Sequence, residues 1–219
     1  MTPILDTNRL DEAERELGMP CEQLLTPLTR YRAVREAEPF AIDNGAFTSF
    51  DAAAFRSLLT RERPRRHLCR FVAVPDVIAA GRTGPAIGDA RLTRELFDAR
   101  SELFPYLAGW PLAYVVQDGQ EDVPIPWRAI RAVFVGGSDR YKDGPHAAAV
   151  VKAAKVRGLW VHVGRINDPA RLTHFERLGA DSFDGSGVAR TTRQRHAIRD
   201  RHSPAPLFPT QPEAVTLPA

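Results

Sequence analysis

Residues 159–184 have the sequence LWVHVGRINDPARLTHFERLGADSFD, which divides into a strand, a loop, a helix and a second strand. The apolar run at 159–163 predicts the first strand, and Asp168-Pro169 has the pattern of a helix start, a cap residue followed by a proline in the first turn. Gly179 predicts the end of that helix, and residues 180–183 the second strand. Because both strands are mostly apolar, we expect them to lie parallel in a sheet that is buried on both faces.

The alternation of strands and helices extends over most of the chain. Strands are predicted at residues 24–28, 39–42, 69–74, 112–116, 132–135, 159–163 and 180–183. Helices are predicted at residues 8–17, 51–61, 87–103, 144–156 and 168–179, and a Pro-rich connection at 124–128 takes the place of one helix. The pattern predicts an α/β fold of the TIM-type (β/α) barrel class, with a doubly wound open sheet as the alternative. An eighth strand is not evident, so the barrel is expected to be trimmed, incomplete, or closed by the N-terminal segment or the tail.

Length and composition limit the class of protein. A chain of 219 residues with 43% hydrophobic residues can form one sizeable core, so we expect a single domain over residues 1–202 and a Pro-rich tail over 203–219. Two cysteines cannot form a four-thiolate zinc site or a disulfide framework, and no apolar run reaches membrane length. These features predict a cytoplasmic protein that does not bind a membrane.

Basic residues suggest an anionic partner. The net charge is only +3, but arginines cluster around residues 61–70 and 190–201, which suits a nucleic acid. Lys142, Arg190, Arg193 and Arg195 are candidates to hold backbone phosphates near the rim of the barrel. The alternative is that all of these residues are ordinary solvated charges.

Polar residues follow the predicted strands and should converge at one rim of the barrel. They are Asp43, Asp76, Gln117, Gly136, Gly137, His162 and Asp184. Asp184 is followed by Gly185 and, two residues later, Gly187, which would leave its carboxylate uncrowded. The alternative for Asp184 is that it caps the next helix.

The residue types at this rim suit chemistry on a glycosidic bond. Asp184 and Asp43 form the natural pair, one carboxylate to attack the anomeric carbon and the other to move protons. Asp76, Gln117 and the backbone of Gly136 and Gly137 could read the edge of a purine such as guanine, and Phe47 could stack on it. His162 could line the same pocket, although a hydrogen-bonded structural histidine is the favoured interpretation.

Five segments in order resemble the tRNA-guanine transglycosylase superfamily, and the small size is most similar to the phage and bacterial deazapurine DNA-modification transglycosylases. The segments are Asp43-Asn44-Gly45-Ala46-Phe47, Val74-Pro75-Asp76, Val116-Gln117-Asp118-Gly119, Gly136-Gly137, and Gly179 through Asp184 with Arg190 six residues on. The resemblance covers about residues 38–195. It implies that Asp184 is the nucleophile, Asp43 the general acid and base, Phe47 the stacking residue and Asp76 the base-reading aspartate.

The resemblance also implies a reaction. Asp184 would attack the anomeric carbon of a flipped-out deoxyguanosine, and a free 7-deazaguanine such as preQ0 would replace the departing guanine without a cofactor. The family's zinc site cannot exist here, since no cysteine follows Cys69. This trimmed form favours DNA as the substrate, and the alternative is an enzyme that acts on an unusual tRNA or on a free nucleoside. The resemblance also implies a location in the host cytoplasm if the protein is phage-encoded, and the family often forms homodimers.

Two other functions remain open at this stage. In the first, Asp43, Asp76, Asp118 and Asp184 would hold Mg²⁺ or Mn²⁺ in a phosphodiesterase-like site. In the second, the chain would be a nucleic-acid-binding barrel without catalytic activity. Metal dependence of any activity would favour the first, and DNA binding that is unaffected by loss of Asp184 would favour the second.

Overall fold

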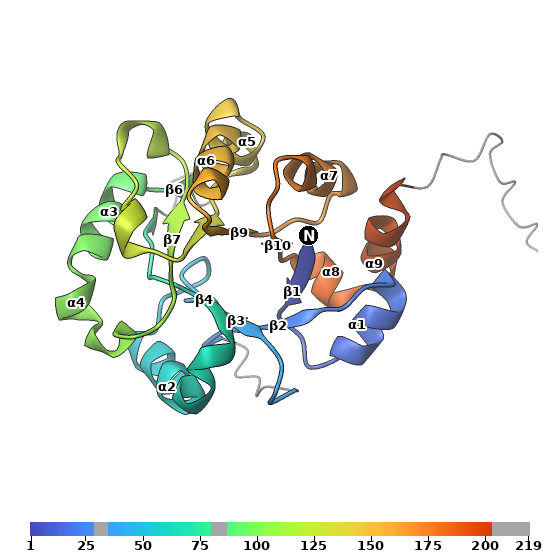
Figure 1. Ribbon diagram of the computed structural model, residues 1–219, viewed down its shortest axis with the longest axis horizontal. Coiled ribbons are helices and arrows are strands. Elements are labelled where there is room, and N and C mark those ends of the chain that lie inside the picture. The colour runs from blue at the N-terminus through green and yellow to red at the C-terminus, as the bar shows by residue number, and fades with distance from the viewer. Residues whose placement is uncertain (29–34, 80–86, 203–219) are drawn as a thin grey trace, which may run out of the picture.

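The computed structural model describes residues 1–28, 35–79 and 87–202 (Figure 1). The strands are β1 Thr2–Leu5, β2 Glu22–Leu25, β3 Phe40–Ile42, β4 Cys69–Ala73, β5 Ile78–Ala79, β6 Ile87–Gly88, β7 Leu112–Val116, β8 Ala132–Val135, β9 Trp160–Val163 and β10 Ser182–Phe183. The helices are α1 Leu10–Leu17, α2 Ala52–Glu62, α3 Ala90–Asp98, α4 Arg100–Leu103, α5 Asp139–Lys142, α6 Pro145–Val156, α7 Pro169–Arg177, α8 Ser186–Arg190 and α9 Thr192–Arg199, with 3-10 turns at Arg63–Leu68, Pro105–Leu107, Gln120–Asp122, Trp127–Ala129 and Asp200–His202.

Eight of the strands form a closed barrel in the order β1-β10-β9-β8-β7-β4-β3-β2. Every neighbouring pair in this barrel is parallel. The helices surround the strands (Figure 1). The predicted TIM-type barrel is therefore confirmed, and the open-sheet alternative is wrong.

The eighth strand is β1, at the N-terminal end of the chain. Thr2 and Pro3 pair with Ser182 and Phe183 of β10, and Ile4 and Leu5 pair with Glu22 and Gln23 of β2. The N-terminal segment therefore closes the barrel, which was one of the two expected ways of closing it. The predicted strand at 24–28 is shifted as well, because β2 pairs with β1 and β3 through residues 22–25 and ends before Pro27.

The helix predicted over residues 87–103 is wrong at its N-terminal end and in the middle, whereas its C-terminal end agrees with the end of α4 at Leu103. Ile87 and Gly88 form β6, which pairs with β5 in a separate antiparallel ribbon. The Asp89 side chain accepts a hydrogen bond from the Leu92 backbone N–H and so caps α3. Ala99 then separates α3 from the short α4. The other predicted helices agree with the structure to within about two residues at each end, as is usual for such boundaries.

Alternation along the strands produces two separate cores. The barrel interior holds Ile4, Leu24, Ala41, Phe71, Ala113 and Ala132, with Phe134 and Trp160 packed against them. The larger core lies between the strands and the helices, and its β9 members are Val161 and Val163. Because successive side chains of a strand point to opposite faces, Trp160 and His162 of the same strand face the barrel interior.

Helix α9 packs against α1, so elements from the two ends of the described barrel lie side by side (Figure 1). Arg195 of α9 is buried at 4% exposure and holds this contact together. Its guanidinium pairs with Glu12 at 3.0 Å and Glu16 at 2.5 Å, and it also donates to the backbone oxygens of Val188 and Ala189. The location explains why Arg195 does not serve as a surface phosphate ligand, contrary to the prediction.

Replacing Arg195 with methionine is expected to lower the free energy of unfolding by about 1–3 kcal/mol, because the change leaves partly buried carboxylates and two backbone oxygens without their donor. Urea denaturation of the purified protein measures the effect. Arg193→Met is the matched control, since Arg193 is exposed on the same helix and has no hydrogen bond or ion pair to a described residue. Equal losses in the two variants would contradict this account of Arg195.

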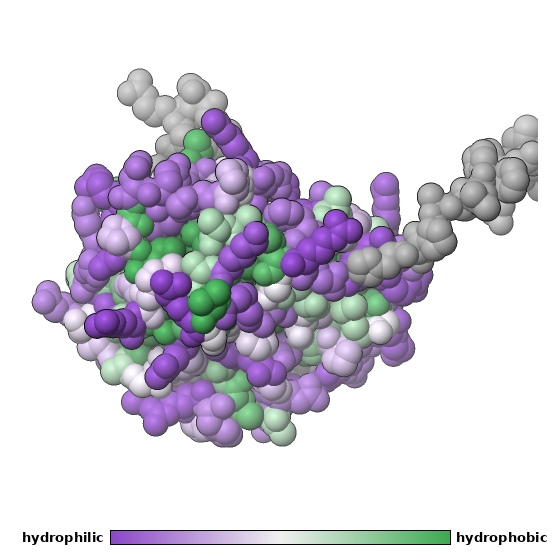
Figure 2. Space-filling model, turned by 45° about the horizontal axis from the view of Figure 1, so that its top comes forward, coloured by the Kyte–Doolittle hydropathy of each residue, from purple (hydrophilic) through white to green (hydrophobic). Residues whose placement is uncertain are grey.

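The surface is mostly hydrophilic on the face seen in Figure 2, where hydrophobic areas are small and interrupted by polar side chains. Within the described ranges, no helix combines the length and the apolar character that crossing a membrane requires. The predicted Pro-rich tail at 203–219 lies outside the described residues.

Candidate active site

Two cavities adjoin each other at the rim where the barrel strands end. The first cavity is lined by Asp43, Asn44, Phe47, Asp76, Ile78, Gly88, Val115, Gln117, Phe134, Gly136, Gly137, Arg165 and Asp184. The second cavity is lined by Asp6, Leu24, Thr26, Leu28, Asp43, Gly45, Phe47, Thr48, Arg165, Asp184, Gly185, Ser186, Ala189 and Arg190. All the base-contact residues expected from the sequence except His162 therefore line the first cavity.

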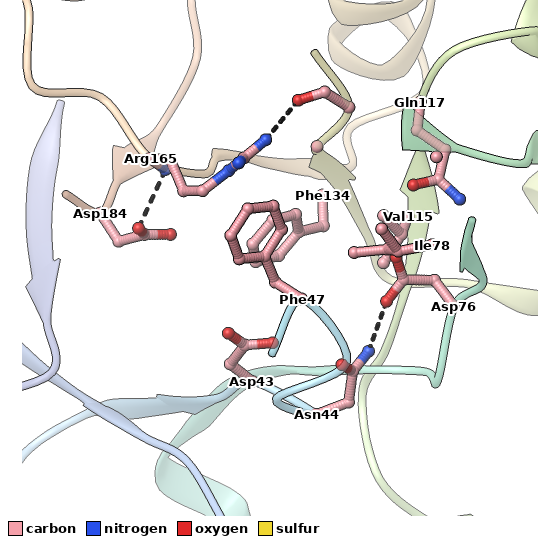
Figure 3. Close-up of a pocket in the computed structure, with 13 residues that line it drawn as sticks. Asp43, Asn44, Phe47, Asp76, Ile78, Val115, Gln117, Phe134, Arg165 and Asp184 are labelled. Carbon is pink, nitrogen blue, oxygen red and sulfur yellow. Dashed lines mark hydrogen bonds between the residues drawn. The ribbon is translucent and has the colours of Figure 1, made fainter. Parts of the chain in front are cut away.

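Four residues line both cavities and so mark the junction between them: Asp43, Phe47, Arg165 and Asp184. Figure 3 shows the carboxylates of Asp43 and Asp184 toward one side of the first cavity, with Asp76 and Gln117 toward the other. A ligand that fills the first cavity and continues into the second therefore lies beside these four residues, the two carboxylates among them.

Asp184 follows β10 and is held at both of its oxygens. Oδ1 accepts the backbone N–H of Arg165 at 2.9 Å, and Oδ2 lies 2.9 Å from Nε2 of His162. The side chain remains 15% exposed. The following Gly185 is packed so closely that an added Cβ would lie 2.1 Å from the Ile166 backbone oxygen, which explains the glycine next to the carboxylate. Asp184 does not cap α8, because Gly185 occupies the cap position and no side chain caps that helix.

Asp43 follows β3 and has a strongly perturbed acidity. Burial, the Asp184 charge and the Asp76 charge together raise the pKa of Asp43 to about 7. Its Oδ1 accepts a hydrogen bond from the Gly45 backbone N–H, at 3.3 Å. A carboxyl group with a pKa near neutrality can both donate and accept a proton under physiological conditions.

Asn44 joins the loop after β3 to the loop after β4. Its Nδ2 donates to the Val74 backbone oxygen at 3.0 Å and to Oδ1 of Asp76 at 2.9 Å, and its Oδ1 accepts the Ala46 N–H. Burial raises the pKa of Asp76 to about 6, although the hydrogen bond from Asn44 opposes that shift. Asp76 thus presents a fixed carboxyl group to the first cavity.

Gln117 offers a hydrogen-bond acceptor to a ligand, and Gly137 offers a donor. Nε2 of Gln117 donates to the Val77 backbone oxygen and to Thr93 Oγ1, so the amide oxygen remains for a ligand, on the cavity side in Figure 3. The N–H of Gly137 makes no hydrogen bond within the described part of the chain. Gly137 has φ +75°, and a Cβ there would lie 2.8 Å from Asp118, so the close approach of this backbone requires glycine.

Phe47 and Arg165 form a stacked pair at the junction of the cavities. The Arg165 guanidinium lies 4.1 Å from the centre of the Phe47 ring, and its Nη2 donates to the Gly137 oxygen at 2.5 Å. Arg165 has φ +58°, a conformation that non-glycine residues adopt rarely and mostly at functional sites. Sequence reasoning did not identify Arg165, although its position directly after a strand-ending glycine would have placed it at the rim.

Lys142 lies elsewhere than predicted, whereas His162 agrees with the favoured interpretation of a hydrogen-bonded structural histidine. His162 does not line the first cavity, because strand alternation turns it into the barrel interior, where it is fully buried. Lys142 is also fully buried and donates to the Gly164 backbone oxygen at 3.0 Å, so it cannot reach a phosphate at the surface. Burial, followed by the Arg165 charge, lowers the pKa of Lys142 to about 8. Lys142 thus supports the loop after β9 that carries Arg165, and His162 contacts Asp184 in the loop after β10.

The remaining phosphate candidates are exposed. Arg190 is at the end of α8 and lines the second cavity, while Arg193 lies further along on α9 and lines neither cavity. Arg190 is therefore the predicted phosphate ligand that the structure places beside the junction.

The alternative of a metal site with four aspartates is not formed. Within the described residues, no group of three or more His, Cys, Asp or Glu side chains is arranged to hold a metal ion. Asp118 lines neither of the two cavities, and its two oxygens accept from the backbone N–H and the hydroxyl of Ser138.

Comparisons with known proteins leave the function open. No family model matches the chain, and no curated protein matches it significantly. Among solved structures, a BexX/CysO complex from Amycolatopsis orientalis is similar, with 13% identity, a TM-score of 0.48, and coverage of 94% of this chain and 93% of the other. A protein described as a putative glycerophosphoryl diester phosphodiesterase from Silicibacter pomeroyi has 13% identity and a TM-score of 0.38, and the match covers 72% of this chain and 50% of the other. A designed cube-shaped protein cage has 13% identity and a TM-score of 0.42, and the match covers 91% of this chain and 70% of the other.

Proposed function

We propose that the protein is a base-exchange transglycosylase that replaces guanine in DNA with a 7-deazaguanine through a covalent intermediate on Asp184. The observation that carries this proposal is the junction, where Asp43 and Asp184 stand between two adjoining cavities. A nucleotide has the same two-part form, a flat base joined through one glycosidic bond to a sugar and phosphate. With the base in the first cavity and the backbone in the second, that bond lies beside both carboxylates.

The first cavity suits the hydrogen-bonding edge of guanine. Guanine presents two neighbouring donors, at N1 and at the 2-amino group, for which Asp76 and the Gln117 oxygen are acceptors. Its O6 is an acceptor, for which the Gly137 N–H is a donor. Phe47 supplies an aromatic face, and 7-deazaguanine retains the same edge.

The reaction has two displacements at the same carbon. In the first, an Asp184 oxygen bonds to C1′ of the sugar, the C1′–N9 bond breaks, and the departing guanine takes a proton from Asp43. In the second, Asp43 accepts the N9 proton of the incoming 7-deazaguanine, whose N9 bonds to C1′ while the Asp184–C1′ bond breaks. Asp43 ends each full cycle in its starting protonation state, which suits its pKa of about 7.

The second cavity would receive the sugar and the backbone. Arg190 and Ser186 line it, and a guanidinium is a suitable partner for a phosphate. Because a side-chain carboxylate cannot reach the glycosidic bond within a stacked helix, the target nucleotide must be flipped out of the duplex, at a cost of a few kcal/mol.

A labelled-base experiment tests the proposed function. The wild-type protein is incubated with labelled guanine or preQ0 and either duplex DNA or bulk tRNA, with and without EDTA. We expect label to enter DNA but not tRNA, and EDTA to leave the rate unchanged. Label in tRNA alone would retain the chemistry and overturn the substrate. Absence of exchange into either nucleic acid, or dependence on a metal, would contradict the proposal and favour a binding or phosphodiesterase function.

A further inference from the structure

A chain of hydrogen bonds runs through the barrel interior to Asp184. The Trp160 indole nitrogen lies 2.8 Å from Ser182 Oγ, and the same oxygen lies 2.9 Å from Nδ1 of His162. Nε2 of His162 then lies 2.9 Å from Oδ2 of Asp184. The chain therefore connects the base of the barrel to one oxygen of the proposed nucleophile.

His162 is enclosed by aromatic rings, which leaves these two neighbours as its polar partners. The imidazole centre lies 4.9 Å from that of Phe71 and 4.7 Å from that of Phe134, and the side chain has no exposed surface. Among the described residues, Ser182 and Asp184 are the hydrogen-bond partners of the ring. The position of the ring proton is thus decided by these two neighbours.

The direction of the chain follows from donor chemistry. An indole N–H can only donate, so Ser182 Oγ accepts from Trp160. The Ser182 side chain is fully buried, and among the described residues Nδ1 of His162 is the one acceptor that its hydroxyl reaches, so the hydroxyl proton goes to Nδ1. A neutral imidazole that accepts at Nδ1 carries its proton on Nε2, which then donates to Asp184. Trp160 and Ser182 thereby select one of the two histidine tautomers.

We propose that the Trp160–Ser182–His162 chain fixes the Nε2–H tautomer of His162, and that His162 is the positioning residue for the Asp184 carboxylate. This inference rests on the proposed function. Asp184 receives one N–H on each oxygen, from Arg165 and from His162, and two such bonds fix both the plane and the rotation of the carboxylate. A carboxylate that is held in this way needs no reorganisation before it attacks.

Nuclear magnetic resonance tests the tautomer without any need for activity. In protein labelled with ¹⁵N-histidine, we expect the His162 signals near neutral pH to show an unprotonated Nδ1 and a protonated Nε2. Ser182→Ala removes the middle of the chain and keeps both ends, so it should give a mixture of tautomers. A wild-type ring protonated at Nδ1, or a Ser182→Ala protein with an unchanged tautomer, would overturn the proposal.

Exchange kinetics test the positioning role. His162→Leu should lower kcat by about 100-fold with KM changed less than about threefold, whereas His162→Gln, which can still donate to Asp184, should recover at least tenfold of that loss. Equal rates for wild type and His162→Leu would overturn the role of His162 and leave the proposed function intact. If wild type itself does not exchange bases, the proposed function fails, while the NMR result still decides whether the chain exists. If His162→Leu does not fold, Ser182→Ala supplies the kinetic comparison, with an expected loss of about tenfold in kcat.

Discussion

Replacing Asp184 with alanine is expected to lower the rate of base exchange at least about 10⁴-fold, because the variant lacks the carboxylate that is proposed to bond to the sugar. Wild-type protein mixed with DNA in the absence of free base should yield a protein–DNA adduct that survives denaturation and is detectable as a mass increase. The alanine variant should yield none. Formation of the adduct requires only the first displacement, so it identifies the nucleophile independently of the second displacement.

Asp139→Asn is the matched control for Asp184→Ala. Asp139 is the first residue of α5, is 70% exposed, and lines neither cavity. The Asp139→Asn variant should form the adduct at the wild-type rate. An adduct in Asp184→Ala that equals the wild-type one would assign the covalent bond to another residue, and Asp43 would be the first to examine.

Replacing Asp43 with asparagine is expected to lower kcat by about 10²–10⁴-fold, because an amide cannot exchange protons with the base. In the Asp43→Asn variant, the rate at which labelled guanine is released in a single turnover should also no longer depend on pH. In the wild type, departure of guanine requires the protonated form of Asp43, so the rate should fall as the pH rises above about 7. A wild-type rate that is flat between pH 5 and pH 9 would contradict the role of Asp43 as the acid.

The same substitution should stabilise the protein. The pKa of Asp43 is raised from 3.8 to about 7 in the folded state, so the folded protein binds this proton more tightly than the unfolded chain does. The contribution of Asp43 to the free energy of unfolding therefore falls as the pH rises from about 4 through about 7. Asp43→Asn should be more stable than wild type by about 1–3 kcal/mol at pH 8, and this difference should vanish toward pH 4. Urea denaturation at the two pH values measures it, and a variant less stable than wild type at pH 8 would contradict the shifted pKa.

Sequence reasoning identified the barrel because its strands are apolar and regularly spaced, a signal that does not depend on tertiary contacts. It missed β1, because Thr2–Leu5 is four residues long and includes a proline, which is too little to show a period. It also placed residues 87–88 in a helix, since only the tertiary pairing of Ile87 with Ala79 reveals β6. The misses thus fall where pairing, and not local pattern, determines the structure.

At the site, residues that follow the strands were expected to gather at one rim of the barrel. This rule correctly predicted that one cavity is lined by Asp43, Asp76, Gln117 and Asp184. It failed for His162, which lies within β9, so that strand alternation governs its direction. Lys142 could not have been recognised as buried, since a basic residue in a polar segment normally faces solvent. The Phe47–Arg165 stack depends on two loops far apart in the sequence and therefore has no local signal.

The pairing of β1 with β10 sets the order in which the barrel can be completed. During synthesis β1 leaves the ribosome first, whereas its partners Ser182 and Phe183 emerge only after all the other strands. Until then the remaining strands can form no more than an open sheet with two unpaired edges, and such edges promote aggregation. Closure, with α9 docking on α1, is consequently a late step that joins distant parts of the chain, and steps of this kind make folding slow. Substitutions that weaken β10 or the Arg195 contacts should therefore reduce the yield of folded protein even where the residues that line the two cavities are unchanged.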